Sequence, residues 1–183
     1  IIFYRSVEFN RGSRSGNANI GLNMKYRIKD NVSVYTQFLI DEMTTRRVFD
    51  GTGYWGNKFA FQLGAKYYNA FKVDGLMLQG EFNWVRPYTY ASKDVKLNAG
   101  HYNQPIAHLW GGNFYEVIGI ARYSKDRWFG TGKLIAGKKG FDFESVEDPY
   151  SYGGNIWRSY DERGSDVGND VGQGNSTNIF IAD

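Results

Sequence analysis

The sequence predicts an all-β chain that forms an antiparallel transmembrane β-barrel. Apolar and polar side chains alternate over long segments, and the links between these segments alternate between short and long. The composition is also typical of long strands with aromatic bands, because 17% of the residues are aromatic and 23 are glycine against only 3 prolines. With 183 residues the chain has the length of one domain, so we expect a single barrel segment over residues 1–183 and no separate soluble domain.

The clearest pair of strands spans residues 17–43. From Asn17 to Lys29 the even positions are apolar and the odd ones are polar or glycine. The alternation resumes from Val32 to Met43, after the turn signal Asp30-Asn31, with Tyr35 and Leu39 as exceptions. A period of two indicates a strand with one apolar and one polar face. Each arm is long enough for the roughly 9 to 11 residues that a tilted strand needs to cross a bilayer.

Six further segments are expected to be strands. They are Ile1–Phe9, Phe59–Phe71, Leu76–Val85, Phe114–Tyr123, Trp128–Gly137 and Asn178–Ala182. The links after Lys29, Phe71 and Tyr123 are tight turns, whereas the links that alternate with them are longer. Outer-membrane barrels sort their connections in this way, with short turns at one mouth and long loops at the other. Because alternating segments reach both ends of the sequence, we expect at least eight strands and a fragment of a larger barrel.

The polar side of the predicted strands carries charged and amide side chains. Burying unpaired charges in a dry core costs several kcal/mol each, so we expect this side to face a water-filled interior. The residues expected to face the lumen are Lys25, Arg27, Gln37, Asp41, Gln62, Lys66, Gln79, Glu81 and Asn83. A soluble antiparallel sheet with one face on a core alternates in the same way, and a β-sandwich therefore stays open as an alternative.

Composition excludes several other classes. No apolar run approaches the roughly 18 residues of a membrane helix, and the mean hydropathy is −0.52, so a helical membrane protein is excluded. A net charge of +3, spread along the chain, does not indicate nucleic acid binding. The absence of cysteine excludes disulfides and thiol chemistry.

Long loops hold the candidate functional residues. His101 and His108 are seven residues apart, which fits no standard metal signature, and we expect them to tie a surface segment together without catalysis. Candidates for contact with a glycan or a partner are Tyr54, Trp55, His101, Tyr102, His108, Trp110, Tyr152 and Trp157. Aromatic rings in loops stack on sugars, but packing of a folded surface cap would use the same residues, and packing is the favoured interpretation.

Asp161, Asp166 and Asp170 are the weak candidates for calcium ligands. They lie in a segment rich in Asp, Asn and Gly, as calcium loops do. Their spacing matches neither an EF-hand nor a calcium-binding repeat, so a solvated loop without metal is the expectation. No cofactor is predicted.

The second half of the chain resembles a known family. The signals are the His101-Tyr102-x-Gln104-Pro105-x-x-His108 loop, Asn113-Phe114, Arg127-Trp128, Tyr152-Gly153-Gly154-Asn155 and Gly174-x-x-Thr177-Asn178. These segments resemble the C-terminal half of Wzi-like capsule assembly proteins, outer-membrane β-barrels of Bacteroidota that include the gliding-motility protein RemB. The resemblance implies a barrel in the bacterial outer membrane, longer than this chain and exposed to surface polysaccharide or motility machinery.

The expected function is that of a non-enzymatic outer-membrane protein. It would serve surface or capsular polysaccharide assembly or attachment, or gliding-motility and secretion machinery. The expected partners are outer-membrane lipid, with surface polysaccharide and other membrane, motility or secretion subunits as candidates, and no nucleic acid. Two alternatives are a porin-like diffusion channel with a polar, slightly basic lumen and a soluble β-sandwich that binds carbohydrate.

Overall fold

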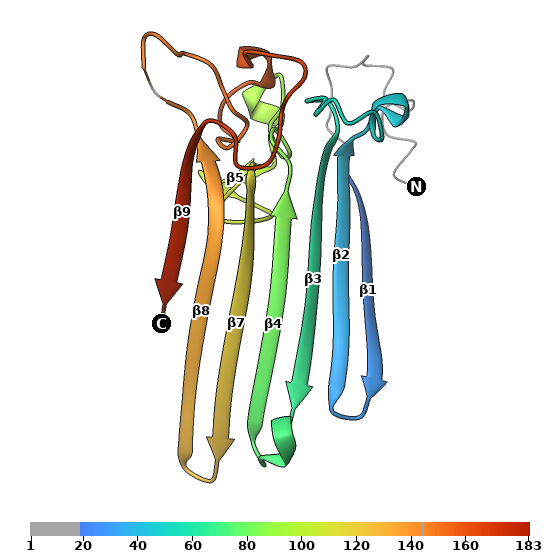
Figure 1. Cartoon of the computed structure of the whole chain (residues 1–183), viewed down its shortest axis with the longest axis vertical. Helices are drawn as coiled ribbons and strands as arrows, with labels where there is room; N and C mark the ends of the chain where they lie inside the picture. The colour runs from blue at the N-terminus through green and yellow to red at the C-terminus, as the bar shows by residue number, and fades with distance from the viewer. Residues whose placement is uncertain (1–18, 144) are drawn as a thin grey trace.

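One antiparallel sheet of seven strands dominates the computed structural model, which describes residues 19–143 and 145–183 (Figure 1). Strands make up 50% of the structure and helices 7%, so the all-β prediction is confirmed. The sheet strands are β1 (Ile20–Lys29), β2 (Val32–Glu42), β3 (Lys58–Tyr68), β4 (Leu76–Val85), β7 (Phe114–Lys125), β8 (Trp128–Phe141) and β9 (Asn175–Ala182). None of the described helices has the length and apolar character needed to cross a membrane.

Seven of the eight predicted strands are present, and each is paired with its neighbours in the chain. The predicted strand Ile1–Phe9 lies outside the described residues. The sheet is open among the described residues, with β1 and β9 as its edges, so a closed transmembrane barrel remains a prediction. The sequence did not predict the two-residue strands β5 (Gly100–His101) and β6 (Gln104–Pro105), which pair inside a long loop.

The strand register separates the side chains into two faces. Gln37, Gln62 and Asn83 pair in one row, and Leu63 and Phe82 pair in the next row on the opposite side. All nine residues predicted to face a lumen lie on one face, here called the polar face. The other, apolar face carries Ile20, Leu22, Met24, Tyr26, Val34, Phe38, Ile40, Phe59, Phe61, Leu63, Tyr67, Leu78, Phe82, Trp84, Tyr115, Val117, Tyr123, Leu134 and Phe180.

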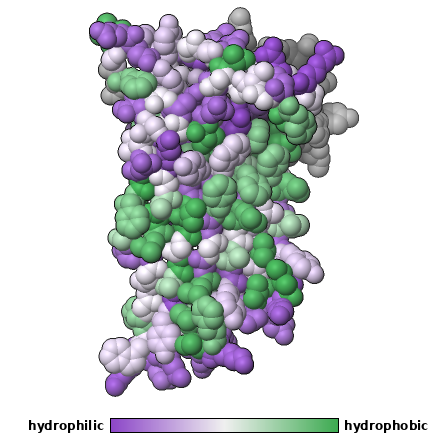
Figure 2. Space-filling model, viewed as in Figure 1, coloured by the Kyte–Doolittle hydropathy of each residue, from purple (hydrophilic) through white to green (hydrophobic). Residues whose placement is uncertain are grey.

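On the inner strands, side chains of the apolar face are more exposed than several charged side chains of the polar face. On the apolar face, Leu63 is 45% exposed and Val117 is 54% exposed. On the polar face, Lys58 and Glu116 are each only 1% exposed. Hydrophobic residues gather over the middle of the strands and hydrophilic residues over their ends (Figure 2). The sheet therefore presents its apolar side outward and keeps part of its charged side covered.

The long loops lie at one end of the sheet and the tight turns at the other (Figure 1). The segments 43–57, 86–113, 142–143 and 145–174, here called the loop cap, cover the loop end of the polar face. A small hydrophobic core lies between the cap and the sheet. Val85 and Phe114 belong to the polar face of the sheet, whereas Tyr90 and Ile156 belong to the cap. The strands thus meet the cap through apolar residues at their loop ends and through polar residues farther down.

Asn113 fastens the cap to the sheet. This residue is fully buried, and its φ of +59° is one that asparagine tolerates better than most residues. Its Nδ2 donates to the carbonyls of Gly140, Tyr152 and Gln173 at 3.0 to 3.3 Å, and its Oδ1 accepts from the Gly172 N–H at 2.7 Å. The end of β8, the loop segment at Tyr152 and the loop residues just before β9 are thereby tied to the residue that precedes β7.

Replacement of Asn113 by aspartate should loosen the cap. The variant N113D keeps the shape but turns a carboxylate oxygen toward three carbonyls, and an uncompensated buried charge costs about 3 to 5 kcal/mol. The expected result is a lower urea midpoint for the change in tryptophan fluorescence and faster proteolysis of the loops. The matched control is N103D, since Asn103 has the same φ of 59° but is exposed. Equal midpoints for the two variants would contradict the role given to Asn113.

Candidate functional site

A chain of hydrogen-bonded side chains crosses the middle of the polar face. Asn83 lies at its centre, because its Nδ2 donates to Glu81 Oε1 at 2.9 Å and to Glu116 Oε1 at 2.8 Å. Gln62 Nε2 also donates to Glu81 Oε1, at 3.0 Å. The alternation of the strands places these four side chains on the same face of β3, β4 and β7. Two carboxylates are therefore bridged by one amide.

The same network reaches β2 through Tyr35. The Tyr35 hydroxyl donates to Glu81 Oε2 and accepts from Gln79 Nε2 at 2.8 Å. Lys66 Nζ lies 5.7 Å from the centre of the Tyr35 ring. Polar groups in partly buried positions are stable only when they have hydrogen-bond partners, and this network supplies donors to both oxygens of Glu81 and to Oε1 of Glu116. Tyr35 breaks the apolar-polar alternation of the sequence because it belongs to this polar network.

His108 connects the loop cap to the network. Its Nε2 lies 2.8 Å from Glu116 Oε1, and its Nδ1 accepts from the Trp110 backbone N–H at 3.1 Å. Since Nδ1 is an acceptor, Nε2 must carry the proton and donate to Glu116. Both ring nitrogens are thus engaged, which leaves no free nitrogen for proton transfer to a substrate. His101, in contrast, is exposed in β5, with its ring 4.3 Å from that of Tyr102.

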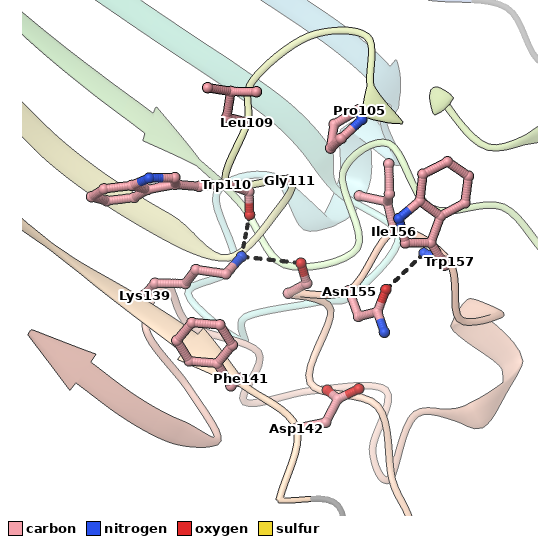
Figure 3. A pocket seen from close by; sticks show the side chains of 11 residues that line it. Pro105, Leu109, Trp110, Gly111, Lys139, Phe141, Asp142, Asn155, Ile156 and Trp157 are labelled. Atoms are coloured by element: carbon pink, nitrogen blue, oxygen red, sulfur yellow. Dashed lines mark hydrogen bonds between the residues drawn. The ribbon is translucent and has the colours of Figure 1, made fainter. Parts of the chain in front are cut away.

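A pocket of about 290 Å³ opens in the cap beside this anchor (Figure 3). Two of the predicted aromatic candidates, Trp110 and Trp157, contribute to its walls. The residues that line it are Pro105, Leu109, Trp110, Gly111, Lys139, Phe141, Asp142, Gly154, Asn155, Ile156 and Trp157. They come from β6, from the end of β8 and from the two longest loops.

Glycines fix the positions of both indoles. A Cβ at Gly137 would lie 2.9 Å from Trp110 Cζ3, and one at Gly100 would overlap the outer ring of Trp157. Trp110 also packs edge-on against Phe114, with ring centres 5.3 Å apart. The absence of a side chain at these glycines therefore lets each indole lie against the backbone, where its orientation is restricted.

The charged groups of the pocket are already paired. Lys139 Nζ donates to the carbonyls of Gly112 at 3.2 Å and Gly154 at 3.1 Å, and also to that of Trp110. Asp142 accepts from the Tyr152 N–H at 2.7 Å and from Arg158 Nη1 at 2.9 Å. The pocket thus combines aromatic walls with charges that are held by other parts of the cap.

The remaining aromatic candidates do not join the pocket. Trp55 packs 4.8 Å from the ring of Tyr160, under the guanidinium of Arg163 at 4.0 Å. Tyr54 lies beneath Arg47, and the Tyr152 hydroxyl donates to Asp148 Oδ2 at 2.7 Å. Tyr102, beside the exposed His101, has 89% of its surface exposed.

Two of the three calcium candidates form ion pairs with basic side chains. Asp161 forms an ion pair with Lys93 at 2.9 Å, and Asp166 forms one with Arg163 at 2.7 Å. Asp170 accepts a backbone bond from Gln173 through its carbonyl oxygen. Among residues 19–143 and 145–183, no three His, Cys, Asp or Glu side chains are grouped as a metal ion would need.

Glu116, Lys58 and Lys139 are important residues that the sequence analysis missed. Glu116 was a detectable signal, since it is a lone acid inside an apolar strand segment. The predicted strand begins at Phe59, whereas in the structure Lys58 starts β3 and forms ion pairs with Asp41 and Glu42 at 3.6 and 3.1 Å. Lys139 lies beyond the predicted strand end at Gly137, but β8 extends four residues past that point.

Two buried tyrosines should make the stability of the cap fall at alkaline pH. Burial, with a smaller contribution from the Asp41 carboxylate, raises the pKa of Tyr90 to about 12. Burial also raises the pKa of Tyr88, whose hydroxyl donates to the Ser151 carbonyl at 2.8 Å. A raised pKa in the folded state means that stability is complete below pH 10 and is lost as the pH rises toward the folded value.

The variant Y90F should therefore reduce the loss of cap stability between pH 10 and 12. At pH 11 the Tyr90 ionisation alone costs the wild type about 1 kcal/mol relative to neutral pH. The measurement is the urea midpoint of tryptophan fluorescence at pH 8, 10, 11 and 12 for wild type and variant. An identical pH dependence in the two proteins would rule out this role for Tyr90.

Comparison with known proteins found no matching family model, no matching curated protein and no matching solved structure. The resemblance to Wzi-like proteins therefore stays a prediction.

Proposed function

We propose that the chain is part of the wall of a non-enzymatic outer-membrane β-barrel, whose apolar face contacts lipid and whose polar face surrounds an interior closed by the loop cap. The observation that carries the proposal is the exposure of the two faces on the inner strands: Leu63 and Val117 of the apolar face are exposed, whereas Lys58 and Glu116 of the polar face are covered. Apolar patches larger than a few hundred Å² are rare on soluble monomers and mark contact with a membrane or a partner.

The height of the apolar face fits a bilayer. Phe59 and Tyr67 lie eight residues apart on that face of β3, which at about 3.4 Å per residue gives about 27 Å along the strand. With the usual tilt of barrel strands the height falls to roughly 20 Å, close to the apolar band of about 25 Å in outer-membrane barrels. Aromatic pairs lie at both ends, Phe59 with Trp84 and Tyr67 with Phe71. Such rings suit the interface between lipid and water.

The loop cap favours a closed scaffold over the alternative of an open channel. His108 and Trp110 extend from the cap onto the polar face. There His108 bonds to Glu116, and Trp110 packs against Phe114. A porin keeps its polar interior accessible to water, whereas here the loops pack onto it. Association with surface polysaccharide or with motility machinery is the part of the proposal that the resemblance supports.

An arginine on the apolar face should impair membrane folding, and an arginine on the polar face should not. In L63R the charge would enter the middle of the apolar band, at an expected cost of about 2 to 4 kcal/mol. The matched control is Q37R, because Gln37 is exposed on the polar face of the neighbouring strand. The measurement is the fraction of the full chain that folds into phospholipid vesicles, followed by heat-dependent migration in gels.

The comparison of L63R with Q37R distinguishes lipid contact from a soluble fold. A folded fraction that falls for L63R and is kept for Q37R supports lipid contact on the apolar face. Similar losses for both variants, or a wild type that folds without lipid or detergent, would favour the soluble β-sandwich instead.

A further inference from the structure

We propose that the polar face binds the phosphate group of a water-soluble phosphate ester at Arg27, Ser33 and Lys66. These three residues form one row across β1, β2 and β3, because Arg27 pairs with Ser33 and Ser33 pairs with Lys66. The row, here called the phosphate row, lies near the tight turns, at the opposite end of the sheet from the loop cap (Figure 1). The proposed function does not require such a site, so this inference goes beyond it.

The Ser33 hydroxyl is buried without a hydrogen-bond partner. Only 5% of the residue is exposed, and no group in the described part of the chain bonds to its Oγ. Buried polar side chains nearly always have partners, because an unsatisfied donor loses its bonds to water and gains none in return. The strand register places Ser33 on the polar face, between two basic residues. Its hydroxyl is therefore a donor with capacity for a ligand.

Two cationic side chains flank this hydroxyl. The Cα atoms of paired residues lie about 5 Å apart, so Arg27 and Lys66 are about 10 Å from each other, with Ser33 between them. Among residues 19–143 and 145–183, neither cation forms an ion pair. Arg27 is exposed and Lys66 is partly exposed, so a ligand from solution can reach both.

The neighbouring acids do not neutralise the phosphate row. Glu81 lies in the adjacent row of the polar face, and its carboxylate already accepts from three side chains. Lys25 belongs to that same row and adds a further positive charge. Asp30, in the turn between β1 and β2, follows Lys29, and these two charges offset each other. This part of the polar face therefore keeps a net positive charge.

A phosphate group matches the three donors of the row. Its three outer oxygens can accept from the guanidinium fork of Arg27, the ammonium of Lys66 and the hydroxyl of Ser33. A carboxylate has two oxygens and a single charge, so it would leave one of these donors without a partner. The charged side chains also disfavour the acyl chains of a phospholipid, which is why the expected ligand is a water-soluble ester.

The test titrates inorganic phosphate and glycerol 3-phosphate into the ¹⁵N-labelled full chain, folded in a maltoside detergent that carries no phosphate. Backbone amide signals are followed at constant ionic strength. We expect saturable shifts at Arg27, Ser33 and Lys66, with an affinity about 10-fold tighter than that for acetate. Shifts that do not saturate, or that are equal for phosphate and acetate, would overturn the site.

A lipid probe distinguishes a soluble ester from a lipid headgroup. Dihexanoyl phosphatidic acid carries the same phosphate monoester on two short acyl chains. We expect it to stay in the micelle and to leave the amide signals of the phosphate row unchanged. Shifts at the row with this lipid, and none with glycerol 3-phosphate, would contradict a water-soluble ligand.

The variant K66M separates a binding site from general attraction by charge. Loss of this cation should weaken phosphate binding about 10-fold, because a charge-assisted hydrogen bond is lost. The matched control is K133M, since Lys133 continues the same line of paired residues on the polar face but lies beside Ile120, without a serine. K133M should leave the affinity unchanged. Equal losses in K66M and K133M would overturn the site.

The variant S33A tests whether the hydroxyl serves the ligand or the fold. Because Ser33 Oγ has no partner among the described residues, its removal should leave the urea midpoint unchanged or raise it. Phosphate binding should nevertheless weaken about 5-fold, because one donor is lost. An affinity equal to that of the wild type, or a lower urea midpoint, would contradict the role given to Ser33.

Discussion

The constraint on which the rest of the structure depends is that a strand places successive side chains on opposite faces. In β1 to β4 most apolar residues share one face and the charged residues share the other, whereas in β7 to β9 the polar face also carries Ile118, Ile120, Ile135 and Ile181. Glu81, Glu116, Lys58 and Lys139 project from that face, and each needs a partner where water is excluded. The polar face is made stable by partners: Asn83 bridges the two glutamates, and backbone carbonyls surround Lys139.

The loop cap follows from the same requirement. At the loop end of the sheet the polar face carries apolar residues, and Val85 and Phe114 pack with Tyr90 and Ile156 of the cap. Lys58 is buried at this junction, where it lies near Asp41 and Glu42 and over the ring of Tyr160 at 4.5 Å. Removal of one partner from a buried ion pair destabilises a protein far more than the intact pair stabilises it. These contacts therefore fix where the loops lie. The same fixed loops enclose the aromatic pocket.

The sequence predicted what depends on local periodicity. Alternation identified the described strands up to Val85 and assigned Gln62 and Leu63 to opposite faces, and the later strands were predicted as segments between turn and loop signals. It could not predict partners that depend on loop folding. His108 reaches Glu116, eight residues away, while Asn113 reaches Gln173 across 60 residues, and neither distance follows from a spacing rule. For the same reason Trp110 and Trp157 were recognised as candidates, but their common pocket was not.

The most direct test of the account compares two nitroxide spin labels on cysteine-free protein in lipid vesicles, one at Leu63→Cys and one at Gln37→Cys. These residues lie on adjacent strands and opposite faces. Oxygen concentrates in the bilayer, whereas a water-soluble nickel complex is excluded from it. The account predicts that the label at 63 collides mainly with oxygen and that the label at 37 does not share this preference. A label at 63 that is shielded from both reagents, as in a core between two sheets, would contradict it.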